Sequence, residues 1–254
     1  GGSGGVVYDV LTDVNLAGTT KTAALTNAGA LSNQGTVTVG VDDTGYDVKF
    51  FGATAGKYAL WDESADSWII SGTQSTVTAG TSNYIAGVNA GNSIASGGNY
   101  NVTIGDEAGT AITTGDGNIA IGYQAADALS TGIRNIAIGK TALGAATTSD
   151  YNTAVGYEAM GLNTTGTRNT AFGVQALYTN VDGDNSVAIG YEALFTQDPA
   201  SNVDMYNTAV GYSAGKLVTT GTNNTFVGGL AGDATTTGAG NTALGMRALT
   251  ANTT

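Results

Sequence analysis

Asn118-Ile-Ala-Ile-Gly-Tyr-Gln-Ala125 is the stretch that decides the fold, because copies of it recur along most of the chain. The same frame opens at residues 101, 118, 135, 152, 169, 186, 207, 224 and 241, and the interval is 17 residues with one exception. Between Ser186 and Asn207 the interval is 21, and the single proline, Pro199, lies there. A less regular copy opens at Asn83. A fixed period of this kind predicts a solenoid in which each repeat forms one coil.

Each position of the frame has a physical role, counting from position one at Asn118. Position five is Gly and position eight is Ala in every regular copy, position four is always apolar, and position three is Ala in seven of nine. Positions two to four are β-prone, so they predict a strand whose third and fourth side chains point to opposite faces. The Ala side should approach a neighbour closely, and the apolar side should also be covered. Gly at position five permits a bend, and a second Gly near position 15 would make the return turn. We expect two short strands and two turns per coil.

The residues at positions one and five are expected to stack from coil to coil. Asn on Asn would form a side-chain amide ladder of the kind seen in stacked strands. The predicted structural ladder consists of Asn118, Asn135, Asn152, Asn169, Asn207, Asn224 and Asn241 with Gly122, Gly139, Gly156, Gly173, Gly190 and Gly211.

Composition narrows the possible functions. The 254 residues include no Cys and no His, which excludes thiol nucleophiles, imidazole bases and the usual zinc ligands. The eight Lys and Arg side chains are scattered against a net charge of −12, whereas nucleic-acid binding needs a basic patch. No apolar run approaches the roughly 18 residues of a membrane span. We predict no enzyme, no cofactor or metal, no nucleic-acid partner and no membrane insertion.

One acidic stretch has the opening of a calcium-binding loop. Asp182-Gly-Asp-Asn-Ser186 has the required spacing at its start. The sixth and twelfth positions of such a loop need Gly and Glu, but Val187 and Ala193 stand there. No metal site is predicted from it.

The N-terminal part has a different pattern. Residues 1–35 are rich in Gly, Ala and Thr and indicate a linker or stalk, whereas residues 36–72 indicate a small β-meander and residues 73–254 the solenoid. The strands expected in the meander are 36–39, 46–51, 57–61 and 67–70. A unit this short cannot bury a stable core alone, so trimerisation or docking on the solenoid end would supply the missing burial.

The repeat resembles two known groups of proteins. The frame Asn-x-Ala-Ile-Gly-x-x-Ala, with its variant Ser186-Val-Ala-Ile-Gly190, resembles the head repeat of YadA-like trimeric autotransporter adhesins. Asn152-Thr-Ala-Val-Gly-Tyr-Glu-Ala-Met160 is similar to repeats in tail-fibre proteins of marine and cyanobacterial phages, and residues 45–64 resemble a segment that precedes such repeats. The adhesin resemblance implies a left-handed parallel β-roll assembled as a trimer, although the 17-residue period is longer than that of the usual adhesin head.

The expected fold is therefore all-β: a parallel β-solenoid or β-roll of about ten 17-residue coils, preceded by a small β-meander, in an intertwined homotrimer. The leading hypothesis is a structural phage tail fibre that positions or forms a host-receptor contact at the virion surface. The alternatives are the head of a trimeric bacterial surface adhesin and a purely structural extracellular filament. The expected partners are copies of the chain itself, other virion or fibre proteins, and a cell-surface glycan or protein receptor.

Two sets of residues are candidates for the receptor contact. The insertion between Ser186 and Asn207 would bulge from the rod, and loops on one face of a solenoid often bind ligands. A neutral insertion is the alternative for that segment. Tyr side chains at position six could stack on sugar rings or, alternatively, pack coil on coil. The candidate residues are Gln197, Asp198, Pro199, Ala200, Ser201 and Asn202 in the insertion and Tyr123, Tyr157, Tyr191 and Tyr212 in the row.

Overall fold

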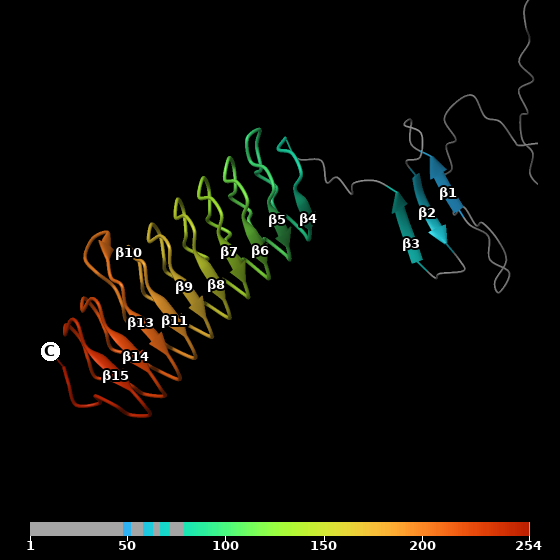
Figure 1. Ribbon diagram of the computed structural model, residues 1–254. Coiled ribbons are helices and arrows are strands. Elements are labelled where there is room, and N and C mark those ends of the chain that lie inside the picture. Colours follow the sequence, from blue (N-terminus) through green and yellow to red (C-terminus); the bar gives the residue numbers. More distant parts are fainter. Residues whose placement is uncertain (1–47, 52–57, 63–66, 72–78, 254) are drawn as a thin grey trace, which may run out of the picture. The chain divides into compact units, whose positions relative to one another are not determined.

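The computed structural model describes residues 48–51, 58–62, 67–71 and 79–253 of the chain. The chain forms two compact units, Gly1–Gly72 and Thr73–Thr254. Within the described ranges every regular element is a β-strand (Figure 1), and no helix is long and apolar enough to cross a membrane.

The first unit contains a three-stranded antiparallel sheet. Its strands are β1 (Val48–Phe51), β2 (Tyr58–Asp62) and β3 (Ser67–Ser71), in the order β1-β2-β3. Trp61 is the Cα partner of Trp68 across the β2–β3 pair. These strands agree with the meander predicted from alternating β-prone runs and polar turns. The strand expected at 36–39 and the linker expected at 1–35 lie outside the described residues.

The second unit is a parallel β-solenoid with no helix among its described residues. One three-residue strand from each coil joins a single ten-stranded sheet, and the strands follow one another along the rod (Figure 1). The strands are β4 (Tyr84–Ala86), β5 (Val102–Ile104), β6 (Ile119–Ile121), β7 (Ile136–Ile138), β8 (Thr153–Val155), β9 (Thr170–Phe172), β11 (Val187–Ile189), β13 (Thr208–Val210), β14 (Thr225–Val227) and β15 (Thr242–Leu244). Every pair is in phase, so equal positions of successive coils are Cα partners, as Ala120 and Ala137 are.

Alternation along the strand separates the interior from the outer surface. Position three is fully buried in the coil, as for Ala120, Ala137 and Ala154, whereas positions two and four on either side are only partly covered. Ala at position eight, mostly apolar residues at position nine and both apolar and polar residues at position twelve complete the interior, for example Leu143 and Leu129. The core is thus a narrow column of small and medium side chains running along the rod.

Gly at position five is required by the backbone. Gly156 has φ +136°, which L residues rarely adopt, and a Cβ there would lie 2.5 Å from the carbonyl oxygen of Gly173. The Gly at position 15 has another role than the return turn we predicted. Gly132 has no positive φ, but a Cβ on it would lie 2.2 Å from the carbonyl oxygen of Ser149 in the next coil. Close coil-to-coil approach explains that Gly.

The prediction of two strands per coil is wrong. Outside the main sheet the described solenoid has one short strand pair, β10 (Gly183–Asp184) with β12 (Val203–Asp204). Elsewhere the return path is a series of turns with residues in the left-handed region, such as Gln124 at φ 53° and Leu143 at φ 51°. These turns still pair with the next coil.

Backbone hydrogen bonds continue from coil to coil outside the strands. The N–H of Ala126 donates to the carbonyl of Ala142 at 2.9 Å, and that of Ser130 to Thr147 at 2.8 Å. The turns therefore satisfy their buried amides without forming a second sheet.

Phe226 explains one of the two departures from Ala at position three. Its ring is fully buried and fills the space beside two glycines at position nine, Gly232 in its own coil and Gly215 in the preceding coil. A Cβ on Gly232 would lie 2.5 Å from the Phe226 ring. In several coils with Ala at position three, as at Ala171, position nine carries a larger side chain such as Leu177.

Phe226→Ala is expected to lower the free energy of unfolding by about 3–5 kcal/mol, because it leaves a cavity in the column. Gly232→Leu alone should also destabilise the fold through its clash with the ring. The double variant restores the usual Ala–Leu combination and should recover much of the loss. Denaturant unfolding of all three variants measures this coupling, and additive losses in the double variant would contradict the packing account.

Candidate functional site

A continuous hydrogen-bond ladder runs through the interior at position one. The Asn152 N–H donates to Oδ1 of Asn135 at 2.9 Å, and the Asn152 Nδ2 donates to the carbonyl of Gly166 at 2.8 Å. The same two bonds recur at most coils, and each of these Asn side chains is almost fully buried. Each side chain therefore links its own strand, its own return turn and the next coil.

The ladder changes at Ser186, which stands where other regular coils have Asn. Gln197 compensates from position twelve of the same coil: its Nε2 donates to Ser186 Oγ at 3.0 Å and to Asn180 Oδ1 at 2.9 Å. Its Oε1 accepts from Asn207 Nδ2 at 2.8 Å. Gln197 is completely buried. Its predicted place in a receptor contact is wrong, because it is an interior residue that repairs the ladder.

The rest of the insertion projects from the coil without interrupting the rod. Strands β11 and β13 on either side of it still pair in phase, Ala188 with Ala209. Pro199 is buried and anchors the start of the loop, whereas Asp198, Ala200, Ser201 and Asn202 are exposed. Four of the six predicted insertion residues are thus accessible.

The predicted Tyr row follows the outer surface at position six, and its rings pack on their neighbours. Tyr191 and Tyr212 are stacked with centroids 5.4 Å apart, and Lys140 Nζ lies 5.9 Å and 5.8 Å from the ring centroids of Tyr123 and Tyr157. The rings are about half exposed, but stacking partners occupy ring faces that a sugar would need. The geometry favours the coil-packing alternative for this row.

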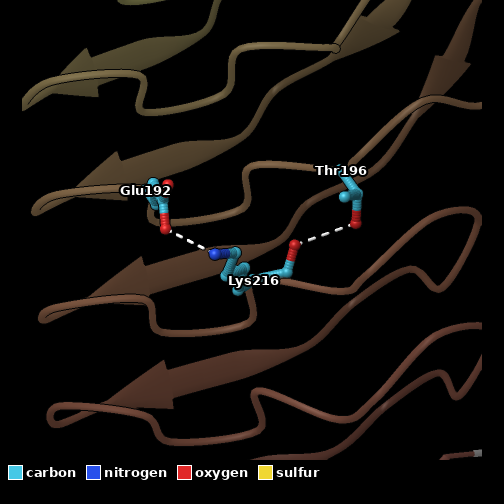
Figure 2. A network of polar contacts seen from close by, with 3 residues as sticks. All are labelled: Glu192, Thr196 and Lys216. Atoms are coloured by element: carbon cyan, nitrogen blue, oxygen red, sulfur yellow. Dashed lines mark hydrogen bonds and ion pairs between the residues drawn. The ribbon is translucent and has the colours of Figure 1, made fainter.

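A second outer row, at position ten, contains Tyr178, Phe195 and Lys216, and Figure 2 shows the contacts of Lys216 with the preceding coil. Lys216 Nζ forms an ion pair with Glu192 at 2.6 Å, and Thr196 Oγ1 donates to the Lys216 carbonyl at 2.8 Å. The ring of Phe195 stacks on that of Tyr178 with centroids 5.4 Å apart, and Lys216 Nζ lies 5.7 Å from the Phe195 ring centroid. All these contacts join successive coils, so the row is structural.

The acidic stretch is also used between coils. Asp184 Oδ1 accepts from the N–H of Thr167 at 2.6 Å, and Asp182 Oδ1 accepts from Thr165 Oγ1 at 2.5 Å. Among the residues that the structure describes, no group of three His, Cys, Asp or Glu side chains could hold a metal ion.

A third outer row, at position 17, was not singled out from the sequence because its residue types vary from coil to coil. It contains Tyr151, Arg168, Asn185 and Tyr206, all with positive φ. Tyr206 Oη donates to Asp204 Oδ2 at 3.2 Å, and this hydrogen bond raises the pKa of Tyr206. The shared feature of these residues is their left-handed backbone conformation, which the structure shows and the residue types do not.

The outer face of the main sheet carries similar side chains from coil to coil. It consists of positions two and four, and the side chains are Ile, Val or Thr in most coils. Residues 79–253 contain seventeen charged side chains, and all of them lie at positions other than one to five. The sheet face is therefore uncharged along the whole row of strands.

Comparison with known proteins found no matching family model, no matching curated protein and no matching solved structure.

Asn163, at position twelve, generates a stability prediction. It is fully buried, and neither its Nδ2 nor its Oδ1 has a hydrogen-bond partner among the described residues. Leu129 holds the same position two coils earlier. Asn163→Leu should raise the free energy of unfolding by about 1–3 kcal/mol, because it removes two unpaired polar groups from the interior.

Asn180→Leu is the matched control in the next coil. The Asn180 Nδ2 donates to Gly183 and its Oδ1 accepts from Gln197, so this substitution should destabilise the protein. Thermal unfolding of both variants measures the difference, and destabilisation by Asn163→Leu would contradict the account.

Proposed function

We propose that this chain is a structural, non-enzymatic segment of a phage tail fibre. Three copies assemble side by side into a rod, and the rod positions or forms a contact with a receptor on the host surface. The single observation that carries the proposal is the uncharged outer face of the ten-stranded sheet.

That face is unusual for a surface left in water. Ile121, Ile138 and Val155 follow one another at position four, and Phe172 beside them is 57% exposed. Soluble surfaces intersperse charged groups, and contiguous apolar patches mark interaction sites. The seventeen charged side chains of this unit lie on the other sides of the coil. Those sides would stay exposed to water after assembly.

The dimensions of the face suit a stable interface. It offers two outward positions on each of ten strands, and specific interfaces use roughly 20 to 30 residues on each side. A second copy of the chain is the partner that fits, because an identical row of strands has the same length and the same spacing along the rod. Cyclic assembly then closes without leaving an exposed copy of the face.

The resemblance of the frame to tail-fibre repeats supports the phage assignment. The alternative, the head of a bacterial adhesin, would use the same face in the same way. It would belong to a bacterial surface protein whose gene also encodes a membrane anchor. A filament that grows end to end would bury the coil ends and leave the sheet face free.

Sedimentation equilibrium tests the assembly. The proposal predicts a mass of three chains of 25.2 kDa at micromolar concentration. Ile121→Glu with Ile138→Glu places charges in the buried face and should give monomers, whereas Thr131→Glu on an exposed turn should leave the mass unchanged. A folded monomer from the unaltered chain would contradict the proposal, and so would fibres that lengthen with concentration.

A further inference from the structure

Tyr206 stands out among the exposed tyrosines by its surroundings. It ends the coil that contains the insertion, and 55% of its surface is exposed. Its hydroxyl is held by Asp204, and the Asp204 carboxylate also accepts from Asn185 Nδ2. The ring is thus fixed in place at its polar end while most of it faces solvent.

The neighbours of Tyr206 along the row are short. Asn185 and Asn223 hold position 17 in the adjacent coils, and Asn223 Nδ2 donates to Thr222 Oγ1. No aromatic ring or cation stacks on Tyr206 within the described part of the chain, in contrast to Tyr157, which has Lys140 at 5.8 Å. Tyr151, three coils earlier in the same row, is likewise covered, by Arg134 at 5.6 Å.

Exposed hydrogen-bonding groups lie near Tyr206 in the sequence and at the same position of the next coil. Asp204 and Asn223 are exposed, and Ser201 and Asn202 are exposed in the adjoining loop. Arg168 lies two coils away, roughly 10 Å along the rod, and its side chain has no hydrogen bond or ion pair among the described residues. A fixed aromatic ring with planar amide and carboxylate groups at its edge matches a sugar ring, which has an apolar C–H face and a rim of hydroxyls.

We propose that Tyr206 is the centre of a saccharide-binding subsite, with the sugar packed on the ring and its hydroxyls bonded to Asp204, Asn223 and the 200–202 loop. The sugar is uncharged, because the exposed Asp204 carboxylate that holds the Tyr206 hydroxyl would repel an acidic one. The inference rests on the proposed function, since it supplies the receptor contact of the rod. It also replaces the position-six row as the place where sugars stack.

Saturation-transfer NMR on the full chain tests the subsite with a panel of methyl glycosides at millimolar concentration. The panel contains neutral hexoses, N-acetylhexosamines and one uronic acid. At least one neutral glycoside should receive saturation, and the uronic acid should receive none. Tyr206→Ala should weaken binding about tenfold or more, the change expected when an aromatic contact worth about 1.4 kcal/mol is lost. Tyr206→Phe, which keeps the ring, should lose less.

Tyr157→Ala is the matched control, because Tyr157 is 42% exposed but has Lys140 against its ring. It should leave glycoside binding unchanged. Saturation of no neutral glycoside, or an equal loss with Tyr157→Ala, would overturn the subsite. Sedimentation of the same samples reports assembly independently: a glycoside-binding monomer contradicts the trimer and keeps the subsite, and a trimer that binds no glycoside does the reverse.

Discussion

The buried Asn side chain at position one is the constraint on which the rest of the solenoid depends. At this corner of the coil the backbone leaves the return turn and enters the strand, so an amide N–H and a turn carbonyl are both buried. One Asn satisfies both, because its Oδ1 accepts from the next coil's N–H and its Nδ2 donates to the carbonyl at position 15 of its own coil, as at Asn152. A buried unpaired polar group costs about 1–3 kcal/mol, so an apolar residue could not replace it.

The narrow interior follows from the ladder and determines which side chains point outward. With backbones held close, only Ala fits at positions three and eight of most coils, and the interior column buries little apolar surface per residue. The larger Ile and Val side chains of positions two and four point outward instead. A second copy of the chain would bury them further, so the thin coil is consistent with the assembly that we propose. This is why a structural fibre is the function that the solenoid supports best.

The sequence predicted much of this fold because the repeat is so regular. The period, the strand at positions two to four, and the opposite directions of Ala120 and Ile121 all follow from counting. The return path did not, because its turns use Gln124 and Leu143 in left-handed conformations that the residue types do not announce. Among the candidate contacts, Gln197 was expected at the surface because a polar amide side chain beside an insertion is typical of an exposed loop. The reason for an amide inside is Ser186, which stands in place of the ladder Asn and accepts a hydrogen bond from Gln197.

Residue-resolved amide hydrogen exchange tests the ladder most directly. The account predicts that the backbone N–H groups of Asn135, Asn152 and Asn169, each bonded to a buried Oδ1, exchange only on global unfolding. Asn207 is the internal comparison, because Ser186 precedes it in the ladder and the Ser186 Oγ pairs with Gln197; its N–H should exchange faster. Exchange at Asn152 as fast as in the exposed turn at Thr131, or protection of Asn207 equal to that of Asn152, would contradict the central claim.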